Sequence, residues 1–387
     1  MNLNGINILV DGYNIEMQKG TGIKTYGATL LQTLVSLGAN VDLLCSRDVD
    51  TTNPLLAESM FFDNQDNRNR TKIDTLISIS KQFLHSKKAS TIDHKFVVKQ
   101  SNDYVFDYLT DASSIFNARE CYVLANSLYK LFKCQTTIKI PRKIDIWHTT
   151  YPIPIKIRNA KKITTIHDLI PLKLPYTTLD DKKFFFNLIR SSIKDSELII
   201  TVSESARRDL LERFDVNPDK VILTYQPIVD NSSLVREDLV DIVLKRYSLE
   251  TQKYILFVGA IEPKKNVGRL IDAYISLDAD MKLVIVGKKA WLWENEISKL
   301  ERVFGKNFSK KVKLLDYLPR TDLNYLYKGA FCFVFPSLYE GFGLPPLEAM
   351  SLGCPVITSN VASLPEVCGD AAIYIDPYNS GDIKDAI

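Results

Sequence analysis

The amino-acid sequence predicts an α/β protein with two parallel-sheet domains. Short apolar runs, typical of strands buried on both faces of a sheet, alternate along the chain with longer segments of helical periodicity. This alternation occurs twice, on either side of a polar segment over 226–252 that we interpret as an interdomain linker. The 387 residues are enough for two domains, each with its own core. We therefore expect two Rossmann-like domains that face each other across a cleft.

The first domain is expected to span residues 1–225. Its strands are predicted from apolar runs at Ile6–Val10, Val41–Cys45, Ile144–His148, Ile163–Ile166, Glu197–Val202 and Val221–Thr224. Helices are predicted at 23–37 and directly after Ser203, a residue type suited to capping a helix start. Residues 47–145 are less regular and are expected to be a variable insert, with helical stretches near 72–86 and 118–133.

The second domain is expected to span residues 253–387. Its strands are predicted at Tyr254–Val258, Lys282–Val286, Val312–Leu315, Phe331–Phe335, Pro355–Thr358 and Ile373–Ile375. The first of these strands leads into Gly259 and the loop AIEPKKN, and then into a helix. The expected apolar face of that helix consists of Val267, Leu270, Ile271 and Tyr274.

A glycine loop lies between two strands of this domain. Residues 337–344 hold Glu340, Gly341 and Gly343, and Pro345 and Pro346 then open a helix, since a proline in the first turn lacks only an N–H that would be unbonded anyway. The helix is expected to end at Gly353. The free N–H groups and the dipole at such a helix start favour an anion such as phosphate.

Glu340 and Glu348 lie eight residues apart in this unit. Eight helical residues span roughly 12 Å. That is too far for an acid and a nucleophile that flank one glycosidic bond, which need about 5–9.5 Å. The spacing would suit the two ends of one long ligand whose middle is held by the backbone. The alternative is that Glu348 is a favourable charge near a helix start and Glu340 a solvated loop residue.

The segment EGFGLPPLEAM (340–350) resembles the Glu-x7-Glu signature of retaining glycosyltransferases of the GT-B fold, family 4, in their bacterial mannosyltransferase-like, group 1 branch. The resemblance continues through 336–360 and covers most of residues 145–377. It includes VGAIEPKKNVGRLIDAY (258–274), TIHDLIPLKLP (165–175) and ITVSESARRDL (200–210). It implies a GT-B enzyme that holds a nucleotide-sugar donor in the second domain and an acceptor on the side of the first.

Lys264 and Lys265 follow a predicted strand and would lie beside the loop of Glu340. Two cations there could clamp the diphosphate of a leaving group, although paired surface lysines are more often solvated. EPKKN resembles the family's Pro-Arg-Lys-Asn, which implies the family lysine's role for Lys265. The resemblance further implies that Glu340 contacts the transferred sugar. It implies donor-binding roles for Lys264, Gly259, Gly341, Phe342, Gly343, Leu344 and Glu348.

His167 and Asp168 directly follow a predicted strand, at the end where open α/β sheets present ligand-contacting groups. A lone histidine at a strand end is more often structural, but the resemblance implies a catalytic contact of His167 with the transferred sugar and an acceptor-side position for Asp168. Gly20, Thr21 and Gly22 invite a dinucleotide interpretation, yet nine residues separate Val10 from Gly20 and the third glycine is out of register. The resemblance instead implies that this loop lines the acceptor side.

Composition limits the partners. A net charge of +3 is near balance and by itself gives no reason to expect a nucleic-acid or acidic partner, so no nucleic acid is expected, and no stretch approaches the length of a membrane span. We expect a cytoplasmic protein. Segment 124–143 interleaves Lys130 and Lys133 with aromatic residues and could contact anionic lipid headgroups at the inner face of the membrane, unless it is an ordinary solvated helix face. No His or Cys spacing predicts a metal site, and Cys332 and Cys354 are expected as buried free thiols.

These observations lead to one functional hypothesis and one alternative. The hypothesis is a metal-independent, retaining glycosyltransferase that moves mannose from GDP-mannose to a glycan or lipid-linked acceptor in cell-envelope polysaccharide synthesis. The alternative is a catalytically degenerate glycosyltransferase-like binding or scaffold protein. It is suggested because the chain stops at Ile387 where relatives continue for several helices, so that we expect a truncated C-terminal end.

Overall fold

The computed structural model describes residues 2–17, 22–49, 51, 53–62, 87–93, 111–228, 232–277, 280–305, 308–316 and 318–387. The helix expected near 72–86 lies outside these residues. The chain divides into two compact units, and each is described by itself. The first comprises Met1–His167, Lys183–Thr201 and Phe214–Ile222, and the second Asp168–Lys182, Val202–Arg213 and Leu223–Ile387.

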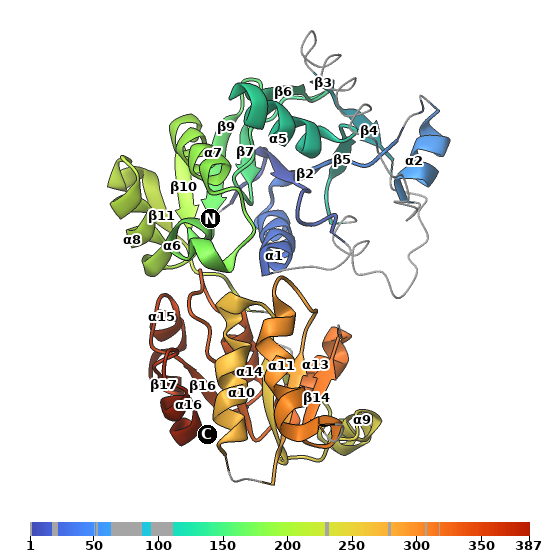
Figure 1. The fold of residues 1–387 in the computed structure, drawn as a ribbon. Coiled ribbons are helices and arrows are strands. Elements are labelled where there is room, and N and C mark those ends of the chain that lie inside the picture. The colour runs from blue at the N-terminus through green and yellow to red at the C-terminus, as the bar shows by residue number, and fades with distance from the viewer. Residues whose placement is uncertain are drawn as a thin grey trace. The chain divides into compact units, whose positions relative to one another are not determined.

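The described residues of the first unit form an eight-stranded sheet with the strand order β11-β10-β9-β7-β1-β2-β5-β4 (Figure 1). Its strands are β1 (Asn7–Asp11), β2 (Asn40–Cys45), β4 (Ser90–Ile92), β5 (Ser114–Asn117), β7 (Ile146–Thr149), β9 (Lys161–Ile166), β10 (Leu198–Thr201) and β11 (Val221–Leu223). Neighbours from β10 to β5 pair in parallel, and β4 joins β5 antiparallel. The strand order reverses between β1 and β7, which marks the place where open α/β sheets bind ligands.

Both faces of this sheet are covered. Ile8 and Val10 of β1 pack in a cluster with Leu31 of helix α1 (Gly22–Ser36), whereas Leu9 packs in a cluster with Tyr122 of α5 (Cys121–Phe132). Neighbouring residues of a strand point to opposite faces, so burial on both faces requires the continuous apolar run that the sequence shows. The two helices confirm the expectations for 23–37 and 118–133.

The remaining elements of the first unit frame this sheet. They are α2 (Pro54–Phe62), α7 (Lys182–Asp195, whose first residue falls with the second unit) and a three-stranded sheet of β3 (Lys87–Lys88), β6 (Thr136–Lys139) and β8 (Ile155–Ile157). Within the part of the chain that the structure describes, no helix combines the length and the apolarity that crossing a bilayer requires.

The second unit contains a parallel six-stranded sheet with the order β14-β13-β12-β15-β16-β17 (Figure 1). Its strands are β12 (Tyr254–Val258), β13 (Lys282–Val286), β14 (Val312–Leu315), β15 (Cys332–Phe335), β16 (Val356–Ser359) and β17 (Ala372–Ile375). All six expected strands are confirmed to within one residue at each end. In chain order the sheet runs 3-2-1-4-5-6, the doubly wound arrangement, so its switch point lies between β12 and β15.

The helices of the second unit pack around this sheet. They are α6 (Ile170–Lys173), α8 (Glu204–Arg213), α9 (Val240–Arg246), α10 (Val267–Ile275), α11 (Trp293–Phe304), α12 (Phe308–Lys311), α13 (Arg320–Gly329), α14 (Leu344–Ser351), α15 (Leu364–Cys368) and α16 (Ser380–Ala386). The expected apolar face of α10 is confirmed, because Val267, Leu270 and Ile271 are fully buried. Helix α9, from the segment 226–252, packs Val243 and Leu244 into the same core.

Local signals expected from the sequence also hold in this unit. Ser203 caps α8, since its Oγ accepts a hydrogen bond of 3.0 Å from the Ala206 N–H. Cys332 and Cys354 are buried free thiols, as expected.

Candidate functional site

The candidate site of the second unit lies at the switch point of its sheet. Strands β12 and β15 are neighbours there, and the loops that follow them carry the predicted lysines and the predicted glutamate. Lys264 and Lys265 belong to a short 3-10 helix, Pro263–Lys265, and the carbonyl of Lys264 accepts a hydrogen bond of 2.8 Å from the Leu338 N–H. The two loops are therefore joined through their backbones.

Lys265 and Glu340 form an ion pair across these loops. The Lys265 Nζ lies 2.5 Å from the Glu340 Oε1, although the two residues are 75 positions apart. Their side chains are only 14% and 12% exposed. The Lys265 ammonium also lies 4.9 Å from the centre of the Phe335 ring. Because little water screens this pair, its electrostatic interaction is stronger than that of an exposed pair.

Lys264 and Asp168 extend the charged cluster. The Lys264 Nζ lies 3.4 Å from the Glu262 Oε1. Burial acts to lower the pKa of Lys264, but the carboxylates of Glu262, Glu340 and Asp168 outweigh it, and this pKa is above its usual value. Burial raises the pKa of Asp168, and the charge of Lys264 opposes that rise. The structure thus brings four predicted site residues together: Lys264, Lys265, Glu340 and Asp168.

The glycine loop leads from this cluster into helix α14. Gly341, Phe342 and Gly343 are buried. Gly343 is the N-cap and has a φ of +113°, a conformation that favours glycine. A Cβ atom at this position would lie 2.8 Å from a methyl carbon of Leu364. Leu344 begins the helix, and prolines in its first turn confirm the predicted start. Within the described residues, the N–H groups of Gly341, Phe342 and Gly343 donate no hydrogen bond, so the loop offers them next to the lysines, an arrangement suited to phosphate.

Glu348 has a different partner. It lies in the second turn of α14, and its Oε1 is 3.3 Å from an Nη of Arg320 in α13. Burial raises the pKa of Glu348, and the charge of Arg320 opposes this rise. Arg320 was not predicted as a site residue, since nothing in the local sequence indicates which helix would lie beside α14.

Two glycines control how closely the first strands of this sheet approach each other. The Gly259 N–H donates to the Val286 carbonyl at 2.9 Å. A Cβ atom on Gly287 would lie 1.9 Å from the Gly259 carbonyl oxygen and 2.6 Å from its carbon. Position 287 must therefore be glycine, because the backbone of Gly259 leaves no room for a Cβ atom there. This constraint arises from the pairing of β12 with β13, and the sequence pattern did not reveal it.

Asn266, like Arg320 and Gly287, is a residue of this region that the sequence did not identify as part of the site. Its Nδ2 donates to the carbonyls of Pro336, at 2.9 Å, and Pro377, at 2.6 Å. Its own backbone has a φ of +62°, which asparagine tolerates better than most residues. Asn266 thus ties the lysine segment to the end of β15, from which the glycine loop starts. The signal was present as the last residue of EPKKN.

In the first unit, His167 lies at the carboxyl end of β9 and is buried. A ring nitrogen, Nε2, lies 2.9 Å from the Thr150 carbonyl oxygen, so it must carry the proton and donate. The ring also makes an edge-on contact with Tyr26, whose hydroxyl lies 3.0 Å from the Thr165 Oγ1. His148 lies 3.0 Å from the same Thr165 oxygen. Burial lowers the pKa of both histidines to about 4, so both are neutral at pH 7.

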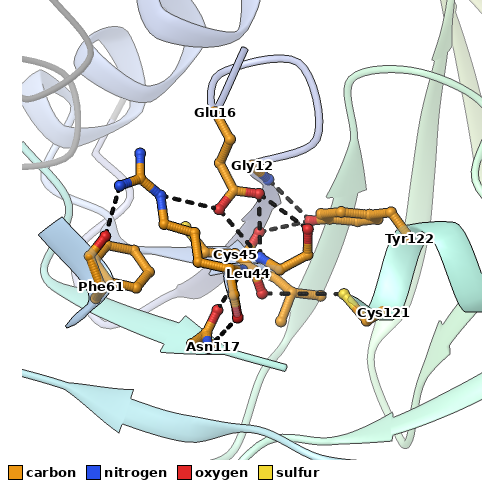
Figure 2. A network of polar contacts seen from close by, with 10 residues as sticks. Gly12, Glu16, Leu44, Cys45, Phe61, Asn117, Cys121 and Tyr122 are labelled. Atoms are coloured by element: carbon orange, nitrogen blue, oxygen red, sulfur yellow. Dashed lines mark hydrogen bonds and ion pairs between the residues drawn. The ribbon is translucent and has the colours of Figure 1, made fainter. Parts of the chain in front are cut away.

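Two buried carboxyl groups lie in the same unit, Asp11 as the last residue of β1 and Glu16 in the segment after it. Burial raises the pKa of Asp11 to about 6 and that of Glu16 to about 7. Figure 2 shows Glu16 at the centre of a polar network: both carboxylate oxygens lie 3.1 Å from the Ser46 N–H, and the Arg47 Nε lies 3.7 Å from Oε1. This network anchors the segment after β1 to the end of β2.

The predicted acceptor-side loop begins beyond that segment. Gly20 and Thr21 lie outside the described residues, and Gly22 is the exposed first residue of α1. The acceptor-side assignment therefore stays a prediction. In the described ranges, no group of three or more His, Cys, Asp or Glu side chains is placed to hold a metal ion.

Comparison with known families finds two matches. Residues 244–387 match the model of the family described as Glycosyl transferases group 1. Residues 116–231 match that of Glycosyltransferase Family 4.

Several characterised proteins are similar in sequence. The chain is 35% identical over 244 residues to the O-antigen chain mannosyltransferase B of Escherichia coli, which covers 60% of this chain and 61% of that protein. It is 29% identical over 251 residues to the O-antigen chain mannosyltransferase RfbU of Salmonella typhimurium, covering 65% of each. It is 32% identical to a serotype-specific mannosyltransferase WbdA of E. coli, of which it covers 30%. The match spans less than two thirds of each relative.

Solved structures share the fold over nearly the whole chain. The crystal structure of Anabaena Alr3699/HepE in complex with UDP and glucose superposes with a TM-score of 0.64 at 12% identity, covering 98% of this chain and 88% of that one. Sucrose-phosphate synthase from Thermosynechococcus elongatus superposes with a TM-score of 0.63 at 16% identity and the same coverage. Because the sequence identities are only 12% and 16%, the likeness shows the fold alone, and this fold is GT-B.

Proposed function

Since the chain belongs to the group 1 glycosyltransferases, we propose that it transfers mannose from GDP-mannose to a glycan or lipid-linked acceptor, in the synthesis of O-antigen or a similar cell-envelope polysaccharide. The names of the similar bacterial mannosyltransferases support the sugar and the pathway. The solved structures with UDP and glucose support a nucleotide-sugar donor of this general kind.

The charged cluster at the switch point of the second unit carries this proposal. A nucleotide sugar has an anionic diphosphate in its middle and hydroxyl groups at either end. The ammoniums of Lys264 and Lys265 and the free N–H groups of the glycine loop suit the diphosphate. Glu340 would accept a hydrogen bond from a hydroxyl of the transferred sugar, and Glu348 would accept one from the ribose. Such bonds to charged groups are worth about 1.5–3 kcal/mol each.

The ion pair between Lys265 and Glu340 would be separated when the donor binds, because the donor offers each side chain a new partner. Before binding, each side chain satisfies the charge of the other in a nearly buried place. When a diphosphate binds, the Lys265 ammonium can contact a phosphate oxygen. Glu340 then loses its contact with Lys265 and accepts a hydrogen bond from a hydroxyl of the sugar instead. Lys265 and Glu340 would thus be two nearly buried, oppositely charged and preorganised groups beside the bond between the sugar and the phosphate of the donor.

We further propose that the transfer retains the anomeric configuration and needs no metal ion. As the glycosidic bond to the donor breaks, negative charge grows on the leaving phosphate, and the two lysines and the loop N–H groups stabilise it. The departing phosphate oxygen would then accept the proton of the acceptor hydroxyl on the same face of the sugar. His167, neutral and with its Nε2 proton engaged by Thr150, would serve as a positioning contact rather than as an acid.

The experiment combines a donor panel with a transfer assay. Thermal shift with GDP-mannose, UDP-glucose and UDP-galactose at equal concentration should show the largest stabilisation with GDP-mannose, because the ligand that binds the folded state most tightly stabilises it most. Transfer to a lipid-linked oligosaccharide should then yield an α-mannoside from the α-linked donor, seen by NMR, and should persist in EDTA. An inverted product, or no hydrolysis or transfer with any donor, would refute the proposal and favour a non-catalytic binding protein.

We also propose peripheral membrane contact through segment 124–143. Leu131 and Phe132 at the end of α5 are 61% and 50% exposed, next to the exposed Lys130 and Lys133. Arg142, near the end of the same segment, pairs with Asp42 and is therefore less available to headgroups. Flotation with phosphatidylglycerol vesicles should depend on Leu131 and Phe132. Equal flotation of a variant with both residues changed to Ser would rule this contact out.

A further inference from the structure

Three successive carbonyl groups of the glycine loop accept hydrogen bonds from two buried serines. The Ser363 Oγ lies 2.9 Å from the Glu340 carbonyl oxygen and 2.7 Å from that of Phe342. The Ser203 Oγ lies 2.6 Å from the carbonyl oxygen of Gly341, between them. Neither serine is exposed to solvent. A hydroxyl has one proton, so Ser363 shares its single donor between the two carbonyls.

These bonds orient the N–H groups of the loop. In a trans peptide unit the C=O bond and the following N–H bond point in opposite directions. The three bonded carbonyls share their peptide units with the N–H groups of Gly341, Phe342 and Gly343. Each serine bond therefore fixes the direction of the N–H group in the same peptide unit, opposite to the bonded carbonyl. A hydroxyl that donates to a carbonyl also polarises its peptide unit and makes the N–H a stronger donor.

The residue that follows Ser363 supports the loop as well. Leu364 is the first residue of α15, and one of its methyl carbons would lie 2.8 Å from a Cβ atom built on Gly343. The start of α15 therefore packs directly against the loop backbone. Ser203 is itself held in place, because it accepts the 3.0 Å bond from the Ala206 N–H while it donates to Gly341. The loop is therefore held by residues that do not belong to it.

We propose that Ser363 is a positioning residue that presets the glycine loop for the diphosphate of the donor. The proposal rests on the proposed function, since it concerns the same site. Ser363 does not touch the donor: it acts through the carbonyls of Glu340 and Phe342, and it aligns the N–H groups before the ligand arrives. Binding then avoids part of the ordering cost that a free loop would incur.

The test compares Ser363→Ala with a matched control, Ser359→Ala. Ser359 is equally buried, but its hydroxyl makes no hydrogen bond in the described part of the chain. By titration calorimetry, Ser363→Ala should bind GDP about tenfold more weakly than wild type, as expected for the loss of one hydrogen bond at the upper end of its usual contribution. Ser359→Ala should bind GDP as wild type does. Inhibition of transfer by guanosine, which has no phosphate, should be the same in all three proteins.

The outcomes separate the two proposals. If wild type binds GDP and transfers sugar but Ser363→Ala binds GDP equally well, the role of Ser363 is wrong and the proposed function stands. If Ser363→Ala weakens guanosine and GDP alike, the serine supports the whole fold and not the phosphate loop, which also overturns the inference. If wild type binds no nucleotide sugar, the proposed function itself fails.

A second variant covers a loss of folding. Should circular dichroism show that Ser363→Ala is unfolded, Ser363→Cys keeps a side chain of similar size with a much weaker donor. It should bind GDP about threefold more weakly than wild type, because part of the hydrogen bond is retained. Wild-type affinity in this variant would overturn the inference.

Discussion

Lys265 and Glu340 show how two residues far apart in sequence can depend on each other. Each is nearly buried, and each neutralises the other in the structure. Removing either one has two effects, the loss of its own contact with the donor and the release of a partner with an uncompensated charge. The same substitution can therefore change donor binding and turnover in different proportions.

At this scale we predict that Glu340→Ala lowers kcat by about 10- to 100-fold, since a hydrogen bond to a charged group is worth about 1.5–3 kcal/mol. Its affinity for GDP should be unchanged or higher, because the Lys265 ammonium is then free for a phosphate. Lys265→Ala should weaken GDP binding and lower kcat together. The measurements are steady-state kinetics and calorimetry.

The matched control for these substitutions is Lys253→Ala, an exposed lysine just before β12. It should behave as wild type in both assays. Wild-type turnover in Glu340→Ala, or wild-type GDP affinity in Lys265→Ala, would contradict the assigned roles.

The loops after neighbouring strands act as one element in the second unit. After β12 and β13 the chain pairs once more, as the Ile261 N–H donates to the Lys288 carbonyl and the Ala290 N–H to that of Ile261. Gly259 and Gly287 permit this close approach. The lysine segment that follows Gly259 is thus positioned by a loop 28 residues further along the chain (287 − 259 = 28).

At this scale we predict that Gly287→Ala lowers the free energy of unfolding by about 3 kcal/mol. The new Cβ atom would clash with the Gly259 carbonyl group, which is backbone and cannot move away as a side chain could. Gly353→Ala is the control: its φ is +74° but nothing lies within 4 Å of the added atom. It should cost only about 1 kcal/mol for the backbone conformation. Urea unfolding measures both, and equal losses would show that the close approach is unimportant.

At the scale of the whole molecule, burial shifts the pKa of several titratable groups, and the largest opposing shifts lie in the first unit. In the first unit, burial raises the pKa of Asp11 to about 6 and those of Glu16 and Asp42 to about 7, and lowers those of His148 and His167 to about 4. The raised acids stabilise the fold at low pH, and this contribution is lost as pH rises through the folded pKa. The histidines act in the opposite sense, since their contribution is lost as pH falls from 6.5 towards 4.

These opposing contributions predict a distinct pH dependence. Between pH 4 and 7 the acids and the histidines act in opposite senses and partly compensate. Because three acids oppose only two histidines, and two of the acids titrate near pH 7 in the folded state, the free energy of unfolding should still fall from pH 6 to 8. Glu16→Gln should make that fall clearly less steep, because Glu16 is one of two acids with a folded pKa near 7 and the histidines already offset part of their effect. Urea unfolding followed by the fluorescence of the buried Trp147, with Trp291 and Trp293 changed to Phe, reports on the first unit.

The exposed Glu294 provides the control, and Glu294→Gln should keep the wild-type slope. A free energy of unfolding that rises from pH 6 to 8, or a Glu16→Gln slope equal to that of wild type, would show that burial does not shift these groups in this way.

The sequence alone determined the local elements. The strands of the second unit, the helix start at Pro345 and Pro346, and the buried face of α10 follow from residues close together in the chain, because side-chain periodicity and turn chemistry are local properties. The glycine loop and the lysine pair could be predicted for the same reason. The residues that complete them could not: Arg320 beside Glu348, Asn266 on the Pro336 carbonyl, Gly287 against Gly259 and Ser363 behind the loop.

Only the tertiary structure decided these partners, and the physical reason is the order of the strands. The sheet places β15 beside β12 although helices α10 to α13 and strands β13 and β14 lie between them in the chain. That placement brings Lys265 to Glu340 and decides which buried carboxylates meet a cation. A sequence pattern specifies which face of an element is apolar, but many strand orders bury the same faces, and charges and close backbone contacts are set by the one order that the chain adopts.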